Sequence, residues 1–209
     1  METPQQDRRL ELWVGPECTI NRVGDRWRDQ CELTGFARRP GDVDSLASLG
    51  ATRVRFPVLW ERVAATPGRL DFTWAGEALA RLQSSGIEAI VGLLHHGSGP
   101  RHTSLVDPHF PTLFADYARQ VAERFPNVRD WTPINEPLTT ARFSCLYGLW
   151  YPHAADDVSF VRALLNQVRA TVLAMRAIRS VNPAARLIQT DDLGFTRSTP
   201  ALAEQAAFD

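Results

Sequence analysis

The sequence is poor in cysteine and carries no excess of charge of either sign. Its three cysteines, Cys18, Cys31 and Cys145, are an odd number without CxxC spacing. This argues against a disulfide framework or a zinc site and predicts reduced thiols. The 23 basic and 24 acidic side chains give a net charge of −1, with no basic stripe or acidic tail. This charge balance gives no indication of nucleic acid or an anionic membrane as partner. It is compatible with a neutral small molecule such as a sugar.

Long apolar runs are also missing. Residues 1–7 are polar and contain no apolar stretch typical of a secretion signal. No run approaches the ~18 apolar residues of a membrane span. Together with the reduced cysteines, these absences predict a cytoplasmic protein. No GxGxxG or P-loop spacing occurs either, which argues against an open-sheet nucleotide-binding domain.

Short apolar runs instead alternate with segments of helical periodicity. The predicted strands cover residues 10–14, 51–56, 87–94, 128–135 and 186–190. The predicted helices cover residues 42–49, 74–85, 111–125 and 159–181. Such alternation implies a parallel sheet with right-handed crossovers. Residues 1–209 are therefore predicted to form one α/β domain of about five βα units. This is the N-terminal portion of a (β/α)8 TIM-type barrel, which takes roughly 250 residues when complete.

The periodicity of the last two predicted helices also selects their inward faces. In the first of them the predicted inward residues are Leu113, Phe114, Tyr117, Val121 and Phe125. In the second they are Leu164, Leu165, Val168, Val172, Met175 and Ile178. Both sets place large apolar side chains at helical spacing on one face, as expected of helices that cover a sheet.

Polar side chains stand where each predicted strand ends. From the first strand to the fourth they are Glu17 and Asn21, Arg55, His95 and His96, and Asn135 and Glu136. In a parallel barrel these ends meet at one mouth, where catalytic groups gather. Each residue alone also fits an ordinary role, as a helix cap, a core histidine or a surface arginine. Their convergence favours a functional site. No third metal ligand has suitable spacing beside the paired histidines, so no metal is predicted.

Several of these strand ends lie within recognisable motifs. Residues 128–137 end in Asn-Glu-Pro, residues 55–63 carry arginine, tryptophan and arginine, and residues 86–96 are followed by Pro100. These segments resemble the fourth-, second- and third-strand motifs of glycoside hydrolase family 1, the β-glucosidase family. Asn21 falls where that family has a sugar-binding glutamine. The match is especially close to family 1-like domains fused to sugar-nucleotide reductases.

The resemblance implies a retaining β-glycosidase and a role for each of five residues. Glu136 corresponds to the acid/base that protonates the leaving oxygen. Asn135 corresponds to the residue that hydrogen-bonds the sugar 2-hydroxyl, and His96 and Asn21 correspond to groups that hold glycone hydroxyls. Arg55 corresponds to the arginine that orients the nucleophile and keeps it ionised. No cofactor or metal is implied, because hydrolysis of this kind uses carboxylates and water.

The sequence departs from the family pattern at several points. The family's nucleophile is a glutamate on the seventh strand, and no similar string follows Glu136. Residues 97–99 read Gly-Ser-Gly where the family has tryptophan and aspartate, so the glycone pocket is predicted to be widened or reshaped. Residues 191–192 are Asp-Asp where the fifth strand usually ends Leu-Asn. Glu17 and Asp191 are possible substitute carboxylates.

Three explanations for the missing half stay open. The chain is a piece of a longer O-glycosidase, two copies pair to close a barrel, or a half barrel binds carbohydrate or regulates without turnover. The predicted partners are therefore a small-molecule β-glycoside or sugar, together with a second copy or a C-terminal half. We expect the isolated chain to be marginally stable or self-associating, because half a barrel leaves apolar sheet edges in water.

Overall fold

The computed structural model describes residues 10–192 and 198–206, and its centre is a five-stranded parallel sheet. The strand order is β1-β4-β5-β6-β7. The strands are β1 Leu12–Val14, β4 Ala51–Pro57, β5 Glu88–His95, β6 Asp130–Asn135 and β7 Arg186–Leu187. Every neighbouring pair in this sheet is parallel. The predicted fold class, α/β with a parallel sheet of βα units, is confirmed.

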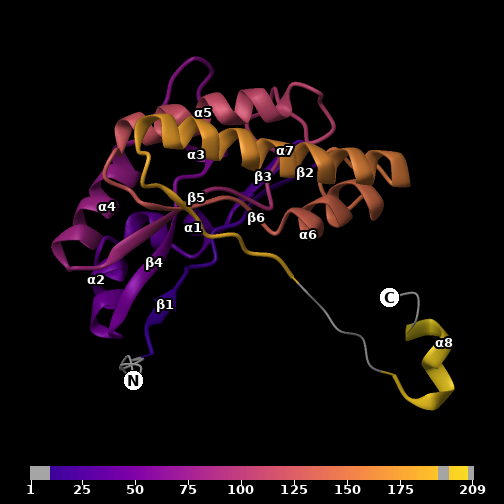
Figure 1. Ribbon diagram of the computed structural model, residues 1–209, viewed down its shortest axis with the longest axis horizontal. Helices are drawn as coiled ribbons and strands as arrows, with labels where there is room; N and C mark the ends of the chain where they lie inside the picture. The colour runs from indigo at the N-terminus through magenta and orange to yellow at the C-terminus, as the bar shows by residue number, and fades with distance from the viewer. Residues whose placement is uncertain (1–9, 193–197, 207–209) are drawn as a thin grey trace, which may run out of the picture.

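Helices connect successive strands and cover the sheet (Figure 1). The longer ones are α2 Gly41–Ser48, α4 Thr73–Ser84, α5 Phe110–Arg124 and α7 Asp157–Val181. The short ones are α1 Gln30–Leu33, η1 Phe36–Arg38, α3 Trp60–Val63, α6 Pro137–Ala141, η2 Arg142–Leu146, η3 Pro200–Leu202 and α8 Ala203–Ala206. Helices α5 and α7 lie side by side, and α7 also contacts β6. This pairing covers the strand that leads to Glu136.

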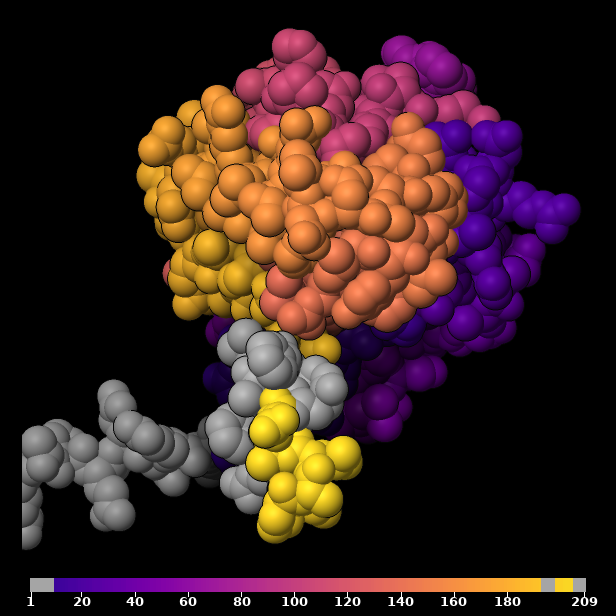
Figure 2. Space-filling model, turned by 90° about the vertical axis from the view of Figure 1, so that its right-hand side faces the viewer, coloured from indigo at the N-terminus to yellow at the C-terminus, as the bar shows by residue number. Residues whose placement is uncertain are grey.

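Helix α7 buries only part of the face that was predicted. Leu165, Val168 and Val172 are 62%, 48% and 47% exposed. Met175 and Ile178 are buried as predicted, and the other buried residues are Ala163, Gln167, Ala170, Thr171 and Ala174. Small side chains let α7 lie close to α5, so the larger apolar residues turn outward. Leu113 of α5, also predicted inward, is 39% exposed. Figure 2 shows the face that α7 and the preceding loop dominate, in orange.

A hairpin precedes the second sheet strand and was not predicted. Strands β2 Ile20–Val23 and β3 Arg26–Asp29 pair antiparallel around a two-residue Gly24-Asp25 turn. Gly24 has φ of 58°, which glycine adopts without the penalty of a Cβ atom. The hairpin lies beside the later loops, since the backbone N–H of Tyr151 donates to the Arg22 carbonyl at 2.8 Å.

The amino-terminal ends of the strands are joined by a buried ion-pair network. Asp130, at the start of β6, is 2% exposed and accepts from Arg53 Nη1 at 2.8 Å. It also accepts from Arg186 Nε and Nη2, both at 2.7 Å. Arg53 additionally pairs with Glu88 at 3.1 Å. One carboxylate therefore links β4, β6 and β7 at the end of the sheet opposite Glu136.

The edges of the sheet expose apolar surface. Leu12 and Trp13 of β1, together with Leu187 of β7, are partly in contact with solvent. Unpaired strand edges of this kind are surfaces for association with further chain, so the predicted self-association stays a prediction. No helix within residues 10–192 or 198–206 is both long and apolar enough to cross a bilayer.

Candidate functional site

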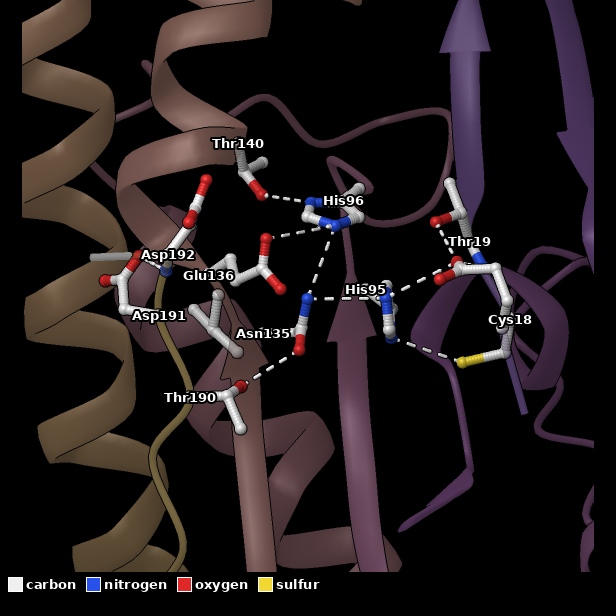
Figure 3. Close-up of polar contacts among 12 residues, drawn as sticks. Cys18, Thr19, His95, His96, Asn135, Glu136, Thr140, Thr190, Asp191 and Asp192 are labelled. Carbon is white, nitrogen blue, oxygen red and sulfur yellow. Dashed lines mark hydrogen bonds and ion pairs between the residues drawn. The ribbon is translucent and has the colours of Figure 1, made fainter. Parts of the chain in front are cut away.

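Most of the polar side chains predicted to share a mouth do lie together (Figure 3). Glu136 directly follows β6 and precedes Pro137 of α6, and its side chain is half-buried. Its backbone N–H donates to the carbonyl of Thr190 at 3.2 Å. The chain after β7 thus continues alongside β6 and forms one wall of the site.

Two residues of the site have backbone angles in the left-handed region. The φ angle is 46° at Glu136 and 56° at His96. For residues other than glycine, such angles cost about 1–3 kcal/mol each and gather at functional sites, where the surrounding structure enforces them. Here they turn the chain sharply at the ends of β6 and β5, which brings both side chains to the mouth.

Asn135 is the hub of the site, because its side chain contacts four other polar side chains. Its side chain is buried, and Arg55 Nη1 donates to its Oδ1. Thr190 Oγ1 donates to the same oxygen at 2.9 Å. On the other side of the amide, Nδ2 lies 3.3 Å from Nε2 of His95 and 3.3 Å from Nε2 of His96. The predicted residues Asn135, His96 and Arg55 are thus brought together.

His96 links this hub to Glu136. Its Nε2 lies 3.7 Å from Glu136 Oε2, and its Nδ1 lies 3.0 Å from Thr140 Oγ1. The ring of Trp150 stands 5.4 Å from the His96 ring. Burial lowers the pKa of His96, although the charge of Glu136 opposes the shift. The His96 imidazole is therefore neutral near pH 7, and its contact with Glu136 is polar rather than an ion pair.

His95 is buried behind the hub. Its Nδ1 lies 3.2 Å from the Sγ atom of Cys18, and its Nε2 lies 3.5 Å from Glu17 Oε1. Burial, and then the neighbouring His96, lower the pKa of His95 to about 4, against the opposing charge of Glu17. His95 is therefore a neutral group at physiological pH.

The two substitute carboxylates are committed to local hydrogen bonds. Glu17 Oε1 accepts from Thr19 Oγ1 at 2.6 Å and from Thr19 N at 3.1 Å. Asp191 is exposed, and its Oδ1 accepts from Asp192 N at 2.9 Å. Figure 3 shows Asp191 and Asp192 on the side of Glu136 away from the histidines. Nothing in these contacts singles out either carboxylate as a nucleophile.

The Gly-Ser-Gly loop after His96 is packed onto a buried carboxyl group. Glu61 is buried, and its Oε1 accepts from the backbone N–H of Gly99 at 2.8 Å. A Cβ atom at Gly97 would collide with this carboxyl group and stand 2.7 Å from the Ile20 carbonyl. The space that a side chain at position 97 would need is therefore filled by Glu61. The predicted widening or reshaping of a glycone pocket at this position stays a prediction.

This arrangement predicts an unusual pH dependence of stability. Burial raises the pKa of Glu61 to about 7 from its ordinary 4.5, and its Oε2 has no hydrogen-bond partner within the described residues. The folded protein therefore binds a proton that the unfolded chain releases. The stabilisation is complete below pH 4.5 and is lost as the pH rises to about 7. The loss is on the order of 3 kcal/mol.

The isosteric Glu61→Gln variant should lack this loss. We expect its melting temperature to exceed that of the wild type at pH 8, with the difference shrinking toward pH 5. Thermal unfolding followed by circular dichroism across this range is the measurement. Glu77→Gln on the outer surface of α4 is the control and should track the wild type. A constant difference between Glu61→Gln and the wild type at every pH would contradict the prediction.

Asn21 does not join the hydrogen-bonded cluster. It lies half-buried in β2, opposite Arg28. Among the residues that the structure describes, its side chain forms no hydrogen bond. Its neighbour Ile20 does reach the loop at Gly97. Asn21 therefore lies near the mouth, and a role in holding sugar stays a prediction.

Sequence reasoning missed several members of the site. Thr140 follows Glu136 by one helical turn, so helical spacing could have indicated it. Cys18 and Thr190 reach the site only through contacts between segments far apart in the chain. Trp150 lies in a loop whose course no periodicity reveals. Cys18 and Trp150 carry no local sequence signal, whereas Thr190 stands at the end of the predicted strand 186–190.

Other parts of the described chain offer less chemistry. No group of three or more His, Cys, Asp or Glu side chains within residues 10–192 and 198–206 could hold a metal ion. A hollow of about 550 Å³ lies at the opposite end of the strands, where Gly86, Glu88, Arg129 and Asp130 are among its lining residues. In parallel barrels that end serves stability, whereas chemistry occupies the carboxyl ends.

Comparison with known proteins gives one family. The model of "Glycosyl hydrolase family 1" matches residues 21–200. The chain is 23% identical to a 6-phospho-beta-glucosidase of Dickeya chrysanthemi over 181 residues, covering 82% of this chain and 39% of the relative. It is 27% identical to Beta-glucosidase A of Thermotoga maritima over 153 residues, covering 69% of this chain and 34% of the relative. The chain thus spans less than half the length of these curated relatives.

Solved structures show the same fold over the same share. A Thermotoga maritima beta-glucosidase in complex with castanospermine superposes with a TM-score of 0.72 at 22% identity, covering 83% of this chain and 42% of that one. The AHE enzyme of Alicyclobacillus herbarius gives a TM-score of 0.72 at 22% identity, covering 82% and 41%. These likenesses confirm that the sheet corresponds to part of a TIM-type barrel.

Proposed function

Because the chain belongs to glycosyl hydrolase family 1, we propose that it forms the acid/base half of a retaining β-glycosidase site. Glu136 is the acid/base that protonates the leaving oxygen and later activates water. The observation that carries this proposal is the placement of Glu136 at the mouth, beside the buried Asn135 that Arg55 holds by its Oδ1.

The neighbouring residues receive roles that fit their contacts. Asn135 donates to the sugar 2-hydroxyl, while His96 and Asn21 hold further hydroxyls of the glycone. Arg55 binds Asn135 and Thr190 through Nη1 alone. Within the described residues its other guanidinium nitrogens form no hydrogen bond, and they are available to orient a nucleophilic carboxylate. The proposed hydrolysis uses carboxylates and water, so it requires no cofactor or metal.

The nucleophile comes from outside residues 1–209, either from a C-terminal half that completes the barrel or from a second copy. We place the assembled enzyme in the cytoplasm and its substrate among small-molecule β-glycosides. The narrower resemblance to domains fused to sugar-nucleotide reductases stays a prediction from the sequence.

A carbohydrate-binding or regulatory module without turnover is the second candidate. The observation that favours it is the commitment of Glu17 Oε1 to Thr19 and of Asp191 Oδ1 to Asp192. Without a second carboxylate about 5–5.5 Å from Glu136, a retaining mechanism cannot proceed. Such a module would still bind carbohydrate but would not hydrolyse it.

Two measurements separate these candidates. Titration calorimetry with deoxynojirimycin and castanospermine measures binding, and a panel of nitrophenyl β-glycosides measures turnover. We expect wild-type protein to bind at least one inhibitor and Asn135→Ala to weaken binding at least tenfold, or about 1.4 kcal/mol. Asn127→Ala, an exposed change at the opposite end of the sheet, is the matched control.

The outcomes are distinct. Binding with turnover supports the assembled glycosidase, and binding without turnover supports the second candidate. Equal affinities for Asn135→Ala and Asn127→Ala would place the sugar elsewhere. No binding of any glycoside or inhibitor, by the chain alone or by a completed barrel, would overturn both candidates.

A further inference from the structure

The orientation of the Asn135 side chain follows from its partner. A guanidinium group has only donors, so the atom that faces Arg55 must be the amide oxygen. Thr190 Oγ1 can donate to the same oxygen at 2.9 Å. The amide nitrogen, Nδ2, consequently faces the two histidines. This assignment rests on the chemistry of arginine rather than on the near-equal shapes of the amide oxygen and nitrogen.

The amide nitrogen in turn fixes the protonation of both imidazoles. Nδ2 carries two hydrogens and cannot accept, and it lies 3.3 Å from Nε2 of His95 and 3.3 Å from Nε2 of His96. For both contacts to be hydrogen bonds, each Nε2 must present a lone pair. The carboxylate oxygens nearest to these nitrogens are farther away, since Glu17 Oε1 lies 3.5 Å from Nε2 of His95 and Glu136 Oε2 lies 3.7 Å from Nε2 of His96. Burial keeps both rings neutral. Each ring then carries its proton on Nδ1, the tautomer that free histidine populates less.

Each Nδ1–H has a partner at the right place. His96 Nδ1–H donates to Thr140 Oγ1 at 3.0 Å, and His95 Nδ1–H donates to Cys18 Sγ at 3.2 Å (Figure 3). Cys18 is buried, and burial raises the pKa of its thiol well above the ordinary range. The thiol therefore stays neutral and unreactive, and its sulfur serves as a weak acceptor.

We propose that Cys18, acting through His95, is a positioning residue for Asn135. The sulfur accepts the Nδ1–H of His95, and the Nε2 lone pair of that ring then holds one hydrogen of the Asn135 amide. This proposal deepens the proposed function and rests on it for its link to sugar binding. The family resemblance assigns no role to Cys18 or His95.

The geometry also gives different roles to the two hydrogens on Nδ2 of Asn135. His95 is buried, so the hydrogen that it holds is out of reach of a ligand. His96 is half-buried at the mouth beside Glu136. A sugar hydroxyl that binds Asn135 must take the hydrogen shared with His96, while the bond to His95 keeps the amide in place. Cys18 and His95 thus preorganise the amide before sugar arrives.

The test is the tautomer of each ring in ¹⁵N-histidine-labelled protein, read from long-range ¹H–¹⁵N spectra at pH 7. We expect His95 and His96 both to be protonated on Nδ1 in the wild type. Cys18→Ala should shift His95 toward Nε2–H and leave His96 unchanged. Cys18→Ser should keep Nδ1–H, because a hydroxyl oxygen also accepts. His95→Gln assigns the signals.

Controls separate this role from general packing. Cys31→Ala removes the other buried thiol of the same apolar cluster and should leave His95 on Nδ1–H. Thr140→Ala should alter His96 alone. Wild-type His95 protonated on Nε2 would overturn the proposal without any variant. So would an unchanged His95 tautomer in folded Cys18→Ala.

Inhibitor binding gives a second, separable readout. We expect Cys18→Ala to weaken castanospermine or deoxynojirimycin binding about three- to tenfold, and Cys18→Ser to stay within twofold of the wild type. If neither the wild-type chain nor a completed barrel binds any inhibitor or glycoside, the proposed function fails while the tautomers are still measured. If the tautomers are as expected but Cys18→Ala binds with wild-type affinity, the positioning role is overturned.

Discussion

Glu136→Gln should abolish hydrolysis of unactivated β-glycosides by any assembled form of the protein. Glutamine keeps the size of the side chain but cannot give a proton to the leaving oxygen. General acid catalysis contributes about 10²–10⁴-fold in rate, so a loss of this size is expected in kcat/KM. The residue is half-buried at the mouth and its side chain forms no buried ion pair, so folding should be unaffected.

The dependence on the leaving group sharpens this expectation. A dinitrophenyl aglycone leaves without protonation, so Glu136→Gln should retain much of the first step with it and lose turnover of alkyl glycosides. Parallel assays on both substrate types, with thermal unfolding as a check on folding, make the measurement. Glu17→Gln is the matched control, because Glu17 lies at the same mouth but hydrogen-bonds Thr19. Equal loss on both substrates would point to a nucleophile, and unchanged turnover would remove Glu136 from the mechanism.

The sequence predicted the centre of the sheet well because β5 and β6 are largely buried. β5 and β6 were found close to their true bounds, and the polar residues at their ends, His96, Asn135 and Glu136, do converge. Parallel topology makes this possible, since all carboxyl ends must meet on one side. The position of these residues was therefore predictable from chain order and periodicity alone.

What the sequence did not predict depends on how elements pack. The outward turn of Leu165 and Val168 follows from the close approach of α7 to α5, which periodicity cannot supply. The contact between Cys18 and His95 joins residues 77 positions apart. The β2–β3 hairpin is different, because its Gly24-Asp25 turn is a local signal that could have indicated it.

Asp130→Ala should destabilise the fold by about 3–5 kcal/mol, the cost of removing one partner from a buried ion pair. The change leaves Arg53 and Arg186 without this carboxylate, and their side chains are 18% and 47% exposed. A typical domain is stable by about 5–15 kcal/mol, so this single change could remove much of the total. Arg53 keeps Glu88 at 3.1 Å as a second partner, which places the expected value toward the lower end.

Urea unfolding of Asp130→Ala measures this loss, with Asp116→Ala as the matched control. Asp116 also bonds an arginine at 2.7 Å, but its side chain is 58% exposed on α5, and exposed pairs contribute only about 0–1 kcal/mol. Asp130→Asn should fall between the two, since its amide still accepts one bond. Similar losses for Asp130→Ala and Asp116→Ala would show that the network does not hold the strands. A large loss would mean that this carboxylate holds β4, β6 and β7 together at the end of the sheet opposite Glu136.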